Sequence, residues 1–379
     1  MRVLVIDDSS FMRRVLSRLI EKDPDLEVVG TAGNGRDGLA AIDEHHPDVV
    51  TLDVQMPGMG GIDMLRELSK RPRHARPAVL MCSSLTAEGA HVTLEAMEIG
   101  AADFITKDAV KAGGSDSGFT AELTSKIKSV GRAVRRRRPQ AQTRAASVAS
   151  PAPMGPPRAA PEGPIREPAI LLIGASTGGP PVVERVIKAM PEVFRFPVVI
   201  AQHMPAAFTK SLAERLNRLC PPEVQLATDG DRAEPGRVYI GEGGKHVQVR
   251  KAGAGFRLEV GNEPADHHYR PSVDALLGSA AAAGQSRTLA MVMTGMGADG
   301  AVGAEAIANA GGTVLTQSEE SCVVYGMPRA VDERGASAGS LDPAGLADVA
   351  SACADGGWAA RKRGGSSGPE AGGVQRRSA

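Results

Sequence analysis

The chain has 379 residues, a length that suggests about two domains of ordinary size. Its 44 basic and 44 acidic side chains balance, and its aromatic content of 3% is low for a protein that stacks bases, so bulk composition argues against a nucleic-acid partner. The apolar runs are far shorter than the roughly 18 residues of a membrane span, and Asp7 and Asp8 interrupt the first run before it resembles a signal peptide. We therefore expect a cytoplasmic protein without direct membrane insertion, whose four widely spaced cysteines are buried thiols.

Residues 1 to 134 alternate short apolar runs with amphipathic stretches of helical period, the pattern of a parallel sheet with crossover helices. Five strands are expected, at Val3 to Ile6, Glu27 to Thr31, Val49 to Leu52, Ala78 to Cys82 and Asp103 to Ile105. The prediction for this part is a doubly wound, flavodoxin-like α/β domain.

Polar side chains follow these strands at the edge where such domains bind ligands. Asp7 and Asp8 follow the first strand, and Asp53 follows the third. A lone aspartate at a strand end is more often a turn former, but three converging carboxylates require a cation, and hard oxygen ligands suit Mg²⁺. Ser83 and Lys107, after the fourth and fifth strands, add a hydroxyl and an ammonium for a phosphoryl oxygen.

With these five residues, the segment 1 to 134 resembles the receiver domain of two-component response regulators. The resemblance implies that Asp53 is the phosphorylated residue and that Asp7 and Asp8 help it to hold Mg²⁺. It also implies a switch formed by Ser83, Phe104 and Lys107. The sequence departs from receivers at Asp108, where proline is usual, and in the long loop from Asp108 to Gly118.

The composition changes at Arg135 to Arg138 and stays rich in proline, alanine and arginine up to Pro168. Such a stretch buries too little apolar area to offset its ordering entropy, so residues 135 to 168 are expected to be a linker. The arginines could contact nucleic acid or acidic lipid, although a solvated linker end is the more common role.

A second, larger α/β domain is expected over residues 169 to 352, mostly parallel and carrying a β-hairpin. Its strands are predicted at Ile170 to Ile173, Val198 to Gln202, Thr288 to Met293 and Thr313 to Leu315, and its hairpin at Val247 to Arg250 and Phe256 to Val260. A flexible tail is expected from 353 to 379.

Ser176 lies in a turn of small residues directly after the first of these strands, the way in which a nucleophile is presented. Such a turn alone is as often a phosphate cradle, and a serine needs a base with an orienting acid. His203 follows the second strand, and Asp299 lies in the loop after the strand at 288 to 293. We expect Ser176 to be the nucleophile, His203 the general base and then acid, and Asp299 the group that fixes the imidazole tautomer.

An α/β-hydrolase is the alternative, but in that class the acid precedes the histidine in the chain. The last histidine here is His268, so Asp299 cannot precede its base. That interpretation would have to use His267 or His268 with Asp229 or Asp231.

Four segments of the second domain resemble motifs of the chemotaxis protein-glutamate methylesterase family: Gly174 to Pro180, Gln202 to Pro205, Arg270 to Asp274 and Thr294 to Gly300. The resemblance implies a serine hydrolase that cleaves γ-glutamyl methyl esters on methyl-accepting chemotaxis receptors, releasing methanol, and deamidates receptor glutamines. It implies activation by phosphate from the chemotaxis histidine kinase and no cofactor for ester cleavage. It assigns the oxyanion donors to the backbone N–H groups of Thr177 and Met296.

Two other functions stay open on the sequence alone. One is a small-molecule serine esterase under phosphorelay control, and the other is a response regulator with a non-catalytic output domain.

Overall fold

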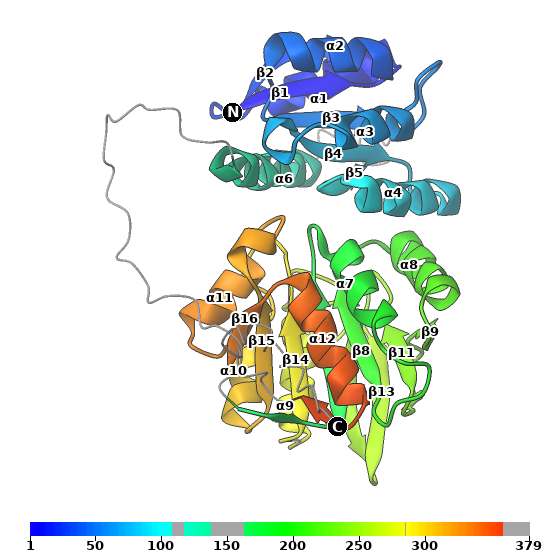
Figure 1. Cartoon of the computed structure of the whole chain (residues 1–379). Helices are drawn as coiled ribbons and strands as arrows, with labels where there is room; N and C mark the ends of the chain where they lie inside the picture. Colours follow the sequence, from blue (N-terminus) through cyan, green and yellow to red (C-terminus); the bar gives the residue numbers. More distant parts are fainter. Residues whose placement is uncertain (108–116, 138–162, 285, 359–379) are drawn as a thin grey trace, which may run out of the picture.

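The computed structural model describes residues 1–107, 117–137, 163–284 and 286–358, which form two α/β units, each built on a parallel sheet (Figure 1). Most of the loop expected at 108 to 118 lies outside the described residues, as do residues 138 to 162 of the expected linker and 359 to 379 of the expected tail. Among the described residues, no helix is both long enough and apolar enough to span a bilayer.

The first unit contains a five-stranded sheet in the order β2-β1-β3-β4-β5, with every neighbouring pair parallel. Its strands are β1 (Arg2–Ile6), β2 (Glu27–Ala32), β3 (Val49–Asp53), β4 (Ala78–Ser83) and β5 (Asp103–Thr106). Every residue of β3 and β4 is buried, as expected for central strands that are covered on both faces. The five predicted strands are confirmed.

Helices cover both faces of this sheet. They are α1 (Ser10–Ile20), α2 (Gly35–His45), α3 (Gly61–Ser69), α4 (Ala87–Ile99) and α6 (Ser117–Arg137), with a short 3₁₀ turn at Arg73–Ala75. Apolar side chains of α1 and α6 pack with Val3 and Val5 on one face, and those of α2, α3 and α4 pack with Leu4 and Ile6 on the other. This alternation follows from the period of two along β1.

Helix α6 extends three residues into the segment expected to be linker. Arginine is a good helix former, and Arg135 adds a 2.8 Å ion pair with the buried carboxylate of Asp48. The next residue, Arg136, pairs with Glu319 of the second unit at 2.7 Å. The first residues of the expected linker, 135 to 137, are thus helical.

The second unit has a seven-stranded, wholly parallel sheet in the order β16-β15-β14-β7-β8-β11-β9. Its strands are β7 (Ile170–Ala175), β8 (Val198–Gln202), β9 (Glu223–Leu226), β11 (Arg237–Ile240), β14 (Thr288–Val292), β15 (Thr313–Gln317) and β16 (Gly339–Leu341). The four predicted strands are confirmed. The other three were missed because they have only three or four residues and include polar or small side chains.

Helices α7, α8 and α12 pack on one face of this sheet, and α9, α10 and α11 pack on the other with the hairpin. Their bounds are α7 (Gly179–Lys188), α8 (Ala206–Leu219), α9 (Val273–Ala282), α10 (Ala301–Asn309), α11 (Met327–Glu333) and α12 (Pro343–Ala354), with a 3₁₀ turn at Glu319–Ser321. The predicted hairpin is confirmed as β12 (His246–Ala252) and β13 (Gly255–Gly261), which form a small sheet with β10 (Arg232–Ala233).

Regular structure also continues past the expected start of the tail. Helix α12 ends at Ala354, and β17 (Gly357–Trp358) then pairs antiparallel with β6 (Ile165–Arg166). The chain on both sides of the second unit is thus held by one short ladder.

The two units meet where α4 and β5 of the first lie against α7 and α8 of the second (Figure 1). The rings of Phe104 and Phe208 stack with centroids 4.1 Å apart. Glu98 on α4 forms an ion pair with Arg215 on α8. Because Thr177, directly after Ser176, also contacts the first unit, the carboxyl edge of the larger sheet faces the smaller domain.

Candidate active site

Strand register places Ser176 beside His203. In the parallel pair β7 and β8, Ala175 lies opposite Gln202, so the next residue of each strand emerges at the same point of the carboxyl edge. The His203 N–H donates to the Ala175 carbonyl at 3.0 Å, and the Gln202 side chain donates to the Ser176 carbonyl at 2.9 Å. The structure therefore brings two of the three predicted residues together through backbone pairing.

Glycines let neighbouring loops approach Ser176 closely. Gly178 has φ +76°, which turns the chain from β7 into α7. A Cβ on Gly295, in the loop after β14, would lie 2.7 Å from the Ser176 Cβ, so a larger residue there would displace the serine. The Ser176 N–H donates to Thr294 O at 3.0 Å, which joins this loop to the turn.

Asp299 binds the imidazole of His203 from the same loop. Its Oδ2 lies 2.7 Å from His203 Nε2, and the two side chains are only 8% and 6% exposed. The backbone N–H groups of Val273 and Asp274, at the start of α9, donate to the carboxylate at 2.7 and 2.9 Å. Burial alone would raise the pKa of Asp299, but the hydrogen bond and charge of His203 together with these N–H groups outweigh burial and lower the pKa to about 2.

An ionised Asp299 fixes how the imidazole of His203 is used. Because the carboxylate can only accept, His203 must carry a proton on Nε2. Its Nδ1 is buried and has no hydrogen-bond partner among the described residues. Tyr269 stacks on the ring at 4.2 Å between centroids, with 12° between the planes. No sequence pattern pointed to Tyr269, since this stacking joins residues that are distant along the chain.

The two residues expected to supply oxyanion donors follow β7 and β14, which are neighbouring parallel strands of the sheet. Thr177 is buried, and its carbonyl accepts from the Thr294 hydroxyl at 2.9 Å. Met296 lies between Gly295 and Gly297, and Gly297 has φ +76°. At the carboxyl edge, the Thr177 peptide is therefore held by a hydrogen bond, and the Met296 peptide lies in a turn between two glycines.

The alternative hydrolase pairing finds no support among the described contacts. Asp229 accepts from the Val260 N–H and Asp231 accepts from the Thr228 N–H, so both carboxylates brace the region of the hairpin. His267 instead contacts Ser272 at 3.2 Å.

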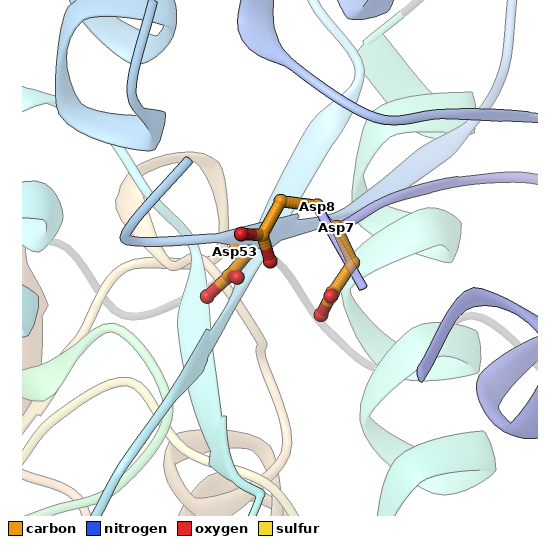
Figure 2. Close-up of side chains that lie close together, drawn as sticks. All are labelled: Asp7, Asp8 and Asp53. Atoms are coloured by element: carbon orange, nitrogen blue, oxygen red, sulfur yellow. The ribbon is translucent and has the colours of Figure 1, made fainter. Parts of the chain in front are cut away.

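The acidic site of the first unit lies at the carboxyl edge of its sheet (Figure 2). Asp7, Asp8 and Asp53 each present a carboxylate oxygen, and these oxygens lie within 4.8 Å of one another. Lys107 Nζ lies 2.7 Å from both Asp7 and Asp53. Burial raises the pKa of Asp53 despite the opposing effect of Lys107, so this carboxylate depends on nearby positive charge.

Two of the three expected switch residues, Ser83 and Phe104, contact elements at the boundary between the units. The Ser83 hydroxyl donates to Gly89 O of α4 at 3.2 Å. Phe104 is buried between Phe208 and Lys126, whose ammonium lies 5.1 Å from the ring centroid. An element next to the acidic site thus contacts α8 of the second unit directly.

Comparison with known proteins matches both units. Residues 3–112 match the family described as "Response regulator receiver domain", and residues 171–349 match "CheB methylesterase". A relative from Oleidesulfovibrio alaskensis, named "Protein-glutamate methylesterase/protein-glutamine glutaminase 1", is 43% identical over 355 residues, covering 88% of this chain and 94% of its own. A Pseudomonas aeruginosa relative, named "Protein-glutamate methylesterase/protein-glutamine glutaminase 2", is 42% identical over 335 residues, covering 88% and 91%.

Among solved structures, the catalytic domain of Thermotoga maritima CheB methylesterase is 38% identical to the matching part. It covers 48% of this chain and 98% of its own length, with a TM-score of 0.46.

Proposed function

This chain belongs to the protein-glutamate methylesterase/protein-glutamine glutaminase family, and on that premise we propose that it is a serine hydrolase acting on methyl-accepting chemotaxis receptors. It cleaves γ-glutamyl methyl esters to glutamate and methanol, deamidates receptor glutamines, and so serves adaptation in chemotaxis. The observation that carries the proposal is the 2.7 Å bond between His203 and an ionised Asp299, directly beside Ser176.

In the proposed mechanism, Ser176 Oγ attacks the ester carbonyl while its proton passes to Nδ1 of His203. The tetrahedral intermediate collapses, the bond to the methoxy oxygen breaks, and His203 returns the proton so that methanol leaves. Water then attacks the acyl-enzyme by the same route and releases glutamate. Asp299 stabilises the imidazolium in both halves, and with a glutamine substrate the leaving group is ammonia.

The negative oxygen of each intermediate needs donors that are already oriented. The backbone N–H groups of Thr177 and Met296 are proposed for this role, because Thr177 directly follows Ser176 and the loop that holds Met296 contacts Ser176 through Thr294 and Gly295. Loss of one such donor typically lowers turnover by about 10²–10³-fold.

Phosphorylation of Asp53, with the chemotaxis histidine kinase as donor, is proposed to control this activity. Asp7, Asp8 and Asp53 supply hard carboxylate oxygens in a cluster that fits Mg²⁺, which when bound neutralises charge on the transferring phosphoryl group. Lys107 already contacts two of these carboxylates and is placed to pair with a phosphoryl oxygen.

Regulation is proposed to act through the contact between the units. The unphosphorylated receiver binds Thr177, next to the nucleophile, and stacks Phe104 on Phe208. In addition, Val323 and Val324, in the loop that binds Thr294 and Gly295, pack against the receiver core. Phosphorylation activates only if it stabilises the undocked arrangement more than the docked one.

The experiment mixes the purified full chain with a methylated receptor fragment, with and without a small phosphodonor and Mg²⁺, and measures methanol. Methanol release that rises with phosphodonor supports the proposal. Turnover of short esters with no release from the receptor fragment would indicate a small-molecule esterase, and failure of a serine-directed acylating probe to label Ser176 would indicate a non-catalytic output.

A further inference from the structure

The hydroxyl of Ser272 lies between the imidazole of His267 and the carboxylate of Asp299. Ser272 is fully buried, and its Oγ lies 2.9 Å from Asp299 Oδ1 and 3.2 Å from His267 Nδ1. The same oxygen accepts from the Ala275 N–H at 3.2 Å, which makes Ser272 the N-cap of α9. Ser272 thus has three polar partners and a single proton to donate.

The chemistry of these partners decides where that proton lies. A hydroxyl donates one hydrogen bond and accepts two. The backbone N–H of Ala275 can only donate, and Asp299, with its pKa lowered to about 2, can only accept. The hydroxyl proton therefore points to Asp299. If it pointed to His267 instead, a lone pair of the Ser272 oxygen would face the negative carboxylate oxygen at 2.9 Å.

The remaining lone pair of Ser272 must then accept from His267. We infer that His267 carries its proton on Nδ1 and that the chain His267 to Ser272 to Asp299 positions the carboxylate that orients His203. This inference rests on the proposed function, which it deepens by naming Ser272 and His267 as positioning residues for Asp299.

A second histidine, His246, binds the backbone of Ser272. The Ser272 N–H donates to Nδ1 of His246 at 3.2 Å, so His246 is neutral there with its proton on Nε2. Burial lowers the pKa of His246, which favours that neutral form. With both its backbone and its side chain fixed, Ser272 presents the hydroxyl to Asp299 without the entropy cost of a free rotor.

The kinetic test uses the full chain with phosphodonor and methylated receptor fragment. Ser272→Ala and Ser272→Gly remove the hydroxyl, and glycine retains most of the capping preference. Both should lower kcat by roughly 10- to 100-fold with KM little changed, the effect expected for one hydrogen bond to a charged group. Ser272→Thr, which keeps the hydroxyl, should restore most of the rate.

The matched control is Asp342→Ala, which removes the N-cap of α12 in the same domain, after the edge strand β16 rather than after β7, β8 or β14. It should reproduce any loss of stability without the loss of kcat. Equal kcat losses in Asp342→Ala and Ser272→Ala would assign the effect to capping and overturn the inference, as would wild-type kcat in Ser272→Gly.

A spectroscopic test is independent of activity. The chain has 8 histidines, and ¹⁵N-labelled histidine with a His267→Gln reference assigns the ring of interest. At pH 8 the wild type should show His267 protonated on Nδ1, and Ser272→Ala should abolish that preference. A His267 protonated only on Nε2 would overturn the inference, whereas a wild type that shows the Nδ1 proton but releases no methanol would overturn only the proposed function.

Discussion

The Thr177 hydroxyl donates a 2.6 Å hydrogen bond to the carboxylate of Asp103, and both side chains are buried. This bond joins the residue after the proposed nucleophile to the first residue of β5 in the receiver. Lys126 lies 3.3 Å from the same carboxylate, so a charged group of the receiver is neutralised within the contact. A buried bond to a charged acceptor is costly to lose, which makes Asp103 a sensitive point for control.

Replacing Asp103 with alanine should raise methanol release in the absence of phosphodonor. Loss of the bond to Thr177 weakens docking of the receiver, and a charge-assisted bond of this kind supports an increase of roughly tenfold. Asp103→Asn keeps an acceptor oxygen without the charge and should give a smaller rise. Asp63→Ala, on the exposed side of α3, is the control. Unchanged basal release in Asp103→Ala would contradict the role given to this contact.

The stacked rings of Phe104 and Phe208 should contribute jointly to inhibition. A stacked aromatic pair is worth about 0.5–1.5 kcal/mol beyond its buried area. Phe104→Leu and Phe208→Leu should each raise basal methanol release a few fold, and the double variant should rise by less than the product of the two. Full multiplicativity in this cycle would mean that the rings act separately.

The Asp53→Asn substitution should abolish stimulation by phosphodonor and leave the basal hydrolytic activity in place. Asp53→Asn removes the group that accepts phosphate, so methanol release should stay at the unstimulated level whether or not phosphodonor and Mg²⁺ are added. The matched comparison is Asp8→Ala, which leaves Asp53 in place but removes one oxygen ligand from the cluster, and should require more Mg²⁺ for stimulation. Normal stimulation of Asp53→Asn would exclude it as the phosphorylated residue.

The depressed pKa of Asp299 predicts a specific acid sensitivity. Since the folded-state pKa, about 2, lies below its ordinary value of 3.8, the carboxylate stabilises the fold above pH 4 and this contribution is lost as the pH falls toward 2. Asp299→Asn should therefore lose stability at pH 6, on the order of 2 kcal/mol, and depend less on pH between 4 and 2. Urea unfolding of both proteins across this range measures the difference. Parallel curves would show that Asp299 is not the group concerned.

The sheets were predictable because their central strands are short, continuous apolar runs with turn signals at each end. The position of Ser176 beside His203 was also predictable, since both follow such strands. By contrast, β9, β11 and β16 depend on tertiary pairing that overrides weak local preference. The roles of Tyr269 and Ser272 arise from contacts with His203 and Asp299, and no local pattern encodes those.

The contact between the units likewise could not be predicted from the sequence pattern. Phe104 is expected to be buried whether or not a second domain covers it, so the residues next to it in the sequence do not indicate the contact with Phe208. The continuation of α6 to Arg137 depends on Asp48, which lies far away along the chain.

Whether Ser176 is the nucleophile is decided by measuring methanol release from methylated receptor fragment by phosphorylated wild type and by Ser176→Ala, with receptor binding and fold checked for both. We expect the variant to bind and fold normally but to release no methanol above the uncatalysed background. Release at the wild-type rate by Ser176→Ala would contradict the assignment of Ser176, His203 and Asp299 as the catalytic group.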